Sequence, residues 1–142
     1  MKRWIVLPLL LVLAACATGP NAPERESPRL SLYRAHAGAP VSAFHYFGRF
    51  DSWESFGDRT LAVWTRPGEA WLLDLDAPCD GLDFAVAIGL TSHTGLVSAR
   101  FDDVLVNQPG PHFPCRIQTI RPLDVGAIRA AERAQRAQAS GT

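Results

Sequence analysis

The sequence predicts a mainly β protein: a small antiparallel sheet curled into a barrel or sandwich, with a flexible N-terminal tether and a short C-terminal helix. Short runs rich in β-branched and aromatic residues follow one another between residues 52 and 121, each closed by a turn signal. A hairpin around Pro67-Gly68 is apolar on both sides, and the last residues are rich in alanine, arginine and glutamine. These three observations define the predicted fold class.

Residues 1–15 have the pattern of a secretory signal peptide: a positive start, an apolar core of about ten residues, then small residues. The apolar run is shorter than the roughly 20 residues that a transmembrane helix needs. Leu13-Ala14-Ala15-Cys16 matches the bacterial lipobox, in which the cysteine receives a diacylglycerol and becomes the first mature residue. We therefore expect lipidation at Cys16. An ordinary cleaved signal followed by an incidental cysteine is the alternative.

Lipid on Cys16 would make the membrane the first partner of this chain, because several acyl chains hold a protein stably on a bilayer. Ala17 follows the cysteine, where aspartate is the usual signal for retention in the inner membrane. The sequence thus predicts an outer-membrane anchor and a protein that faces the periplasm.

Composition divides the rest of the chain into three zones. Residues 16–40 are polar, small and proline-rich, which predicts a lipidated tether. Residues 41–124 form the predicted compact domain, which carries eleven Asp or Glu against six Arg. Such an acidic domain argues against nucleic acid as a partner, since phosphate contacts need clustered cations. Residues 125–142 are the Ala/Arg/Gln-rich tail.

The predicted strands of the compact domain are short, and a turn follows most of them. In chain order they are 52–56, 60–65, 70–75, 87–92, 96–101, 103–106 and 116–121.

The hairpin around Pro67-Gly68 allows a prediction of register. With Arg66 opposite Glu69, or with all four residues in the loop, Trp64 would lie opposite Trp71 and Val63 opposite Leu72. Trp64 and Trp71 would then share a face, and both faces of the hairpin would be apolar, as in a central hairpin covered on two sides. With Trp53, these tryptophans form the candidate binding surface. Ordinary core packing of the aromatic pair is the alternative.

Cys79 and Cys115 remain once Cys16 is assigned to lipid, and an even pair in an oxidising compartment favours a disulfide. One bridge would join the end of one predicted strand to the start of another. A redox-active or metal-binding pair is the alternative, although the spacing is not Cys-x-x-Cys.

Several short motifs together resemble a family of small proteobacterial lipoproteins that is catalogued only as a domain of unknown function. The resemblance covers about residues 47–124. It rests on Trp53-Glu54, Asp58-Arg59-Thr60-Leu61-x-Val63, Leu72-x-Asp74-Leu75-x-x-Pro78-Cys79-x-Gly81-Leu82, Ile88-Gly89-Leu90, Phe101-Asp102-x-Val104 and Cys115-Arg116-Ile117-x-x-Ile120-x-Pro122-Leu123. It implies a periplasmic domain with paired cysteines, and it supplies no activity, cofactor or site residue.

Possible catalytic residues are few. Asp74, Asp76, Asp80 and Asp83 do not fit the spacing of a calcium loop, and turn carboxylates explain them better. Asp102 and Asp103 are adjacent on a strand, so their side chains should point to opposite faces. Ser92 and His93 lack the Gly-x-Ser-x-Gly turn that exposes a serine nucleophile.

Two functions remain open. The first, which we favour, is a non-catalytic lipoprotein without a cofactor whose domain binds an envelope protein or a small ligand. The second is a small hydrolase or metal-dependent enzyme centred on Ser92, His93 and the nearby aspartates. The tail is predicted to be helical, with Arg129, Arg133 and Arg136 on one face, either solvated or in contact with anionic lipid or an acidic partner.

Overall fold

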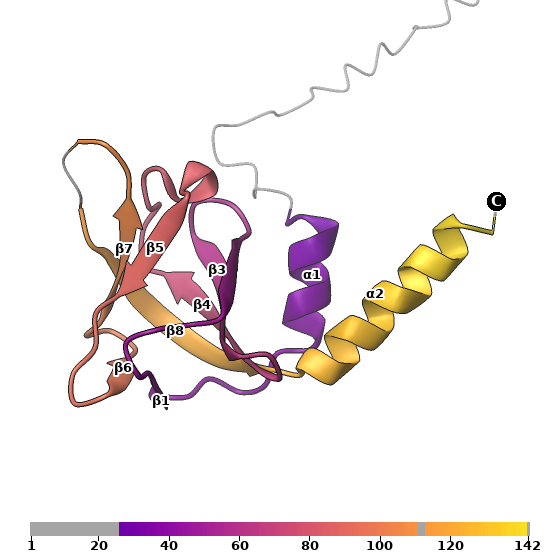
Figure 1. Ribbon diagram of the computed structural model, residues 1–142, viewed down its shortest axis with the longest axis horizontal. Helices are drawn as coiled ribbons and strands as arrows, with labels where there is room; N and C mark the ends of the chain where they lie inside the picture. The colour runs from indigo at the N-terminus through magenta and orange to yellow at the C-terminus, as the bar shows by residue number, and fades with distance from the viewer. Residues whose placement is uncertain (1–25, 111–112, 142) are drawn as a thin grey trace, which may run out of the picture.

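The structure is a computed structural model that describes residues 26–110 and 113–141. The predicted signal peptide and the predicted lipidation site, Cys16, lie outside the described residues. The fold is mainly β and sandwich-like, with two antiparallel sheets and a helix near each end of the described chain (Figure 1). The predicted fold class is confirmed, in its sandwich form.

The larger sheet has six strands in the order β2-β3-β4-β8-β7-β5, and the smaller sheet pairs β1 with β6. All pairs are antiparallel. The strands are β1 (Ala43–His45), β2 (Ser52–Ser55), β3 (Thr60–Arg66), β4 (Glu69–Leu75), β5 (Ala87–Leu90), β6 (Leu96–Ser98), β7 (Asp103–Asn107) and β8 (Cys115–Leu123). A 3-10 helix, η1 (Leu82–Phe84), lies between β4 and β5. Sequence reasoning missed β1, which is only three residues long.

Strand β8 connects the two halves of the large sheet. Its residues Ile117–Leu123 pair with β4, whereas Cys115 and Arg116 pair with β7. Because one strand changes partner along its length, the sheet curls, and β5 and β7 turn their apolar side chains toward the same interior as β3 and β4.

The two faces of the sheet bury separate cores. One core contains Leu61, Val63, Leu73, Ile117 and Ile120 of β3, β4 and β8, together with side chains from β5 and β7 of the same sheet and from β1 and β6 of the smaller sheet. The other places Ala62, Ala70, Leu72 and Leu123 against the helices α1 (Pro28–Ala35) and α2 (Val125–Ala139). The expectation that the β3–β4 hairpin is covered on both sides is confirmed.

Residues 28–40 were predicted to be part of the tether, but they pack against the domain, beginning with helix α1. Ser27 caps the helix by accepting a hydrogen bond from the Leu30 N–H at 3.1 Å, and Pro28 occupies the first turn, where its missing N–H costs nothing. Leu30 and Tyr33, three residues apart, are both buried. Beyond the helix the Gly38 N–H donates to the Pro122 carbonyl at 2.8 Å, so the chain then runs along β8.

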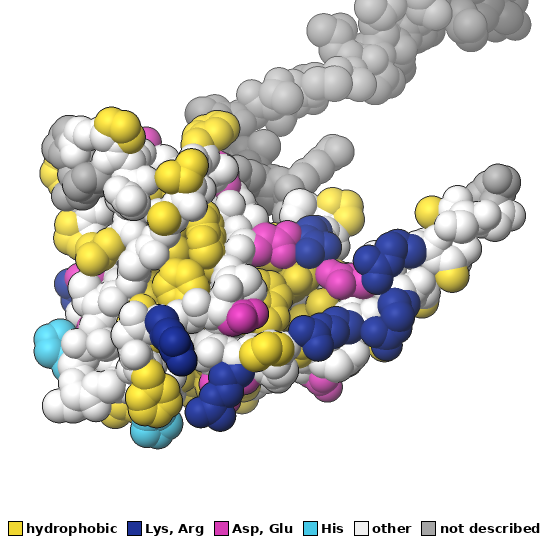
Figure 2. Space-filling view, in the orientation of Figure 1, with side chains coloured by type: hydrophobic (Ala, Val, Ile, Leu, Met, Phe, Trp, Pro, Cys, Tyr) yellow, Lys and Arg dark blue, Asp and Glu magenta, His cyan; other side chains and the backbone are white. Residues whose placement is uncertain are grey.

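Helix α2 docks only by its first turns. Asp124 caps it through the Ala127 N–H at 2.9 Å, and Val125 and Ile128 are its buried residues. Residues 133–141 are exposed, and Figures 1 and 2 show the helix extending beyond the rest of the domain. The prediction of a C-terminal helix with little apolar contact is confirmed.

Candidate functional site

The two cysteines form the predicted disulfide. Cys79 lies four residues after β4 and is fully buried, and Cys115 is the first residue of β8. Their Cα atoms are 5.6 Å apart, within the range of ordinary disulfides. The bond therefore fixes the loop between β4 and η1 to the strand that joins the two halves of the sheet.

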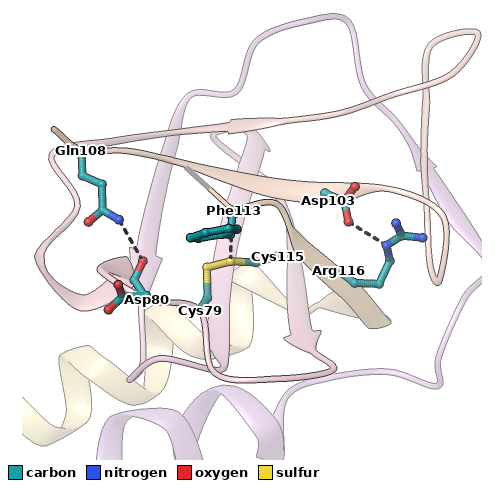
Figure 3. The surroundings of a disulfide bond; sticks show 7 residues. All are labelled: Cys79, Asp80, Asp103, Gln108, Phe113, Cys115 and Arg116. Atoms are coloured by element: carbon teal, nitrogen blue, oxygen red, sulfur yellow. Dashed lines mark hydrogen bonds and ion pairs between the residues drawn. A yellow bond between two sulfur atoms is a disulfide. The ribbon is translucent and has the colours of Figure 1, made fainter. Parts of the chain in front are cut away.

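Polar contacts beside each cysteine strengthen the same junction (Figure 3). Arg116 donates from Nε to Asp103 Oδ1 on β7 at 2.7 Å, and Gln108 Nε2 donates to the Asp80 carbonyl at 3.4 Å. Gly81 has a φ of 79°, in the left-handed region that favours glycine, so glycine suits the turn after Cys79. This arrangement supports a structural disulfide.

The predicted hairpin register is wrong by one residue. Arg66 does pair with Glu69, but a β-bulge between Trp64 and Arg66 shifts the remaining pairs, so Val63 lies opposite Trp71 and Trp64 opposite Ala70. Trp64 therefore packs against the helix-side core. Trp53 and Trp71, both opposite Val63, pack against the other core. The three half-buried tryptophans do not form one surface.

Trp71 lines an open groove of about 470 Å³ between residues 43–49 and the β3–β4 turn. Its indole ring stacks on Phe44, with ring centroids 5.0 Å apart, and its Nε1 donates to Thr65 Oγ1 at 3.4 Å. Phe47 extends the aromatic wall and is 75% exposed. We call this site the Trp71 groove; its lining residues are Ala43, Phe44, His45, Phe47, Arg49, Thr65, Arg66, Glu69 and Trp71.

The Trp71 groove combines aromatic faces with two arginines. Arg49 and Arg66 are exposed, and no carboxylate of the described residues lies within ion-pairing distance of either. Glu69, the acidic side chain of the lining, instead accepts a hydrogen bond from the Thr65 hydroxyl. Sequence reasoning found only Trp71 here, although the alternation Ala43-Phe44-His45-Tyr46-Phe47 is a strand signal that could have pointed to the rest.

On the opposite face, a polar cluster ties α1 and α2 to β2. Arg29 pairs with Glu54 of β2 and donates to Glu132 of α2 at 3.1 Å, and the Tyr33 hydroxyl donates to Glu54 at 3.3 Å. The hydrogen bond to Glu54 raises the pKa of Arg29. Burial, and then the negative charge of Glu54, raise the pKa of Tyr33 to about 12. The cluster therefore keeps Arg29 charged and Tyr33 neutral where the two helices meet the sheet.

His93 and Asp102, two residues of the alternative catalytic site, do lie together. His93 Nδ1 is 3.1 Å from Asp102 Oδ1, and the buried Asp102 carboxylate also accepts from Thr91 Oγ1 at 2.9 Å and the Ser98 N–H at 2.7 Å. Ser92 is exposed and shares no side-chain hydrogen bond with His93 in the described residues. Asp103 points away to Arg116, so the expected separation of the two aspartates is confirmed.

The acidic residues near Cys79 do not act as one group. Asp74 pairs with Arg34, at 2.8 Å to Nη2, and accepts from the Thr60 hydroxyl at 2.9 Å. The hydrogen bond from Arg34 to Asp74 raises the pKa of Arg34. Within residues 26–110 and 113–141, no three His, Cys, Asp or Glu side chains are grouped to hold a metal ion.

Among the helices that the structure describes, none has the length and apolar character to cross a membrane.

A comparison with the sequence models of protein families identifies the family of this chain. Searches of curated proteins and of solved structures gave no match. The sequence model of one family, described as "Family of unknown function (DUF6491)", matches residues 1–139. This chain therefore belongs to that family.

Proposed function

We propose that this protein is a non-catalytic outer-membrane lipoprotein, anchored through Cys16 and facing the periplasm. Its disulfide-stapled domain binds an envelope protein or a small ligand in the Trp71 groove. The observation that carries the binding role is the groove itself, where stacked and exposed aromatic rings lie beside two arginines that have no carboxylate partner among the described residues. Aromatic and arginine side chains are the residues most enriched at binding hot spots.

Two further features support the location. The lipobox at residues 13–16 supplies an anchor, and a disulfide between Cys79 and Cys115 suits an oxidising compartment such as the periplasm. The first test is the intact mass of protein extracted from membranes, before and after reduction and alkylation. An acylated N-terminal Cys16, with two thiols released only by reduction, is expected. A Cys16→Ser variant should lose the lipid mass, and wild-type protein without lipid would overturn the anchor.

The binding role is tested by photocrosslinking in cells. A photoreactive phenylalanine analogue replaces Phe47 in the groove or, as the control, Phe84, which is 89% exposed outside it. We expect a discrete crosslinked product at position 47 that is absent at position 84. The product should also disappear when Arg49→Glu reverses a charge of the groove. Identical products at both positions, or none at position 47, would contradict binding at this site.

The His93–Asp102 contact favours the hydrolase as a second candidate. The side chain of His93 is 79% exposed, so a substrate could reach its ring. A fluorophosphonate, which labels activated serines, separates the two functions. The non-catalytic proposal expects no labelling, whereas labelling of Ser92 that depends on His93 would establish the enzyme instead.

A further inference from the structure

We propose that a second groove, bounded by β1, β6 and β8, binds a small sugar that carries an anionic group, either a carboxylate or a phosphate. This site, called here the Arg100 groove, has a volume of about 650 Å³ and is lined by residues 40–43, 98–101, 118, 119 and 121. It adjoins the Trp71 groove at Ala43 but shares no other residue with it. The inference does not depend on the proposed function.

The lining of the Arg100 groove is positively charged. Arg100 and Arg121 line it, and none of its lining residues is acidic. Arg121 donates one hydrogen bond, to the Gly38 carbonyl at 3.2 Å, which holds the side chain and leaves other N–H groups for a ligand. Arg100 is exposed, and its guanidinium has no side-chain partner among the described residues. Guanidinium groups match carboxylates and phosphates with two parallel hydrogen bonds.

The Arg100 groove also offers uncharged polar groups. Ser42, Ser98, Gln118 and Thr119 are among the lining residues, and in the described part of the chain none of their side chains forms a hydrogen bond. Hydroxyl and amide groups both donate and accept, so they can pair with the hydroxyls of a ligand. Phe101, 72% exposed, adds an aromatic ring against which the C–H groups of a pyranose can pack. A hydroxylated ring with one negative group matches the chemistry of these lining residues.

The backbone at Arg100 adopts an unfavourable conformation. Arg100 has a φ of 68°, in the left-handed region that disfavours every residue with a side chain except, at times, Asn and Asp. Its N–H donates to the Ile117 carbonyl at 2.6 Å, and its carbonyl accepts from Arg116 Nη1 at 2.9 Å. The turn is thus held on both sides in a conformation that glycine would adopt more easily. Strained residues of this kind concentrate at ligand sites, and here the strained residue carries the guanidinium.

The test is an NMR titration of the full-length chain carrying Cys16→Ser, with its disulfide intact. The probes are glucuronate, glucose 6-phosphate and neutral glucose. We expect saturable shifts of the groove amides with at least one anionic sugar, and binding of glucose at least tenfold weaker. Comparing glucuronate with glucose 6-phosphate tells a carboxylate site from a phosphate site. Equal binding of glucose, or saturable shifts outside the groove only, or no saturable shifts, would overturn the proposal.

Arg100→Gly sharpens the test, because glycine relieves the backbone while removing the guanidinium. We expect at least tenfold weaker binding of the anionic sugar, with no decrease in the unfolding temperature. Thr94→Gly is the matched control, since Thr94 also has a positive φ, 52°, but lies outside the groove; its binding should be unchanged. If Arg100→Gly does not fold, Arg100→Gln, which keeps a side chain of similar reach without the charge, replaces it. Binding by the folded variant equal to that of the wild type would refute the proposal.

Discussion

The two faces of the large sheet are covered in different ways. One face is closed by other strands and by a covalent bond between Cys79 and Cys115. The other is covered by two helices near opposite ends of the described chain, which bury only Leu30, Tyr33, Val125 and Ile128 and are tied to β2 through Arg29 and Glu54. Elements with few buried apolar contacts open locally at lower free energy than core strands. We call the first the disulfide face and the second the helix face. The comparison teaches that the disulfide face determines the global stability, whereas the helix face is where local opening occurs.

The largest expected effect is on the disulfide face. Replacing Cys79 and Cys115 together with serine should lower the free energy of unfolding by up to about 4 kcal/mol, because the bridge closes a long loop in the unfolded chain. Urea denaturation monitored by circular dichroism measures this loss. Cys16→Ser is the control and should leave the denaturation midpoint unchanged. An unchanged midpoint for the double variant would show that the disulfide does not contribute to the stability of this face.

The next largest effect is on the helix face. Ile128→Ala should cost about 2–3 kcal/mol, since it removes a buried side chain from a helix with few others. Hydrogen exchange should accelerate in α1 and α2 and much less in β4 and β8. The exposed Arg133 offers a control, because Arg133→Ala should leave exchange unaltered. Equal acceleration in all four elements would mean that the helices and the sheet unfold as one unit.

Glu54→Gln removes the carboxylate that pairs with Arg29 and accepts from Tyr33. Because the pair is partly exposed, the expected loss is only about 1 kcal/mol. The stability of the wild type should fall with added salt more than that of the variant, which urea denaturation at several salt concentrations will show. Asp51→Asn, a nearby exposed carboxylate, should keep the salt dependence of the wild type. The same salt dependence in both variants would mean that the Arg29–Glu54 ion pair does not stabilise the helix face.

The smallest effect appears only at high pH. The pKa of Tyr33 is raised to about 12, against an ordinary value near 10, so the unfolded chain loses this proton before the folded one does. Tyr33 therefore stabilises the fold fully below pH 10, and this contribution declines between about pH 10 and pH 12. Tyr33→Phe should flatten the stability profile in that window. Unfolding by urea at a series of pH values measures it, and a profile unchanged by the substitution would contradict the shift.

Tyr46 sharpens this comparison, because the chain has two tyrosines and they lie on opposite faces. Burial alone raises the pKa of Tyr46, whereas Tyr33 also faces the Glu54 carboxylate. The Tyr46→Phe variant retains Tyr33, and the Tyr33→Phe variant retains Tyr46. Absorbance titration should give a higher pKa for Tyr33 in the first variant than for Tyr46 in the second. The reverse order would indicate that Glu54 does not act on Tyr33 in solution.

The sequence was most informative where one local rule dominated. Turn signals between short apolar runs were enough to predict β2, β3, β4 and the central position of the hairpin, and an even pair of cysteines predicted the disulfide. Helix α1 was missed because its apolar residues are few. The Ser27-Pro28 cap with Leu30 and Tyr33 at a spacing of three was nevertheless a readable helix signal.

The binding grooves were largely unpredictable for a different reason. Residues 40–43 reach the Arg100 groove by running beside β8, nearly 80 residues later in the chain, through long-range pairing that no local pattern specifies. The register error at Trp64 arose likewise from a single bulge, since one inserted residue reverses which face each later side chain occupies. Sequence reasoning therefore found Trp71 but placed it beside the wrong neighbour.

The bulge in β3 also gives each face its own fluorophore. Because it turns Trp64 toward the helices and leaves Trp71 and Trp53 on the disulfide face, the indole emission of the domain comes from two separate cores. A variant that retains only Trp64 would report on the docking of α1 and α2, and one that retains only Trp71 would report on its groove. Emission spectra of these two proteins can thus follow the opening of one face while the other stays closed.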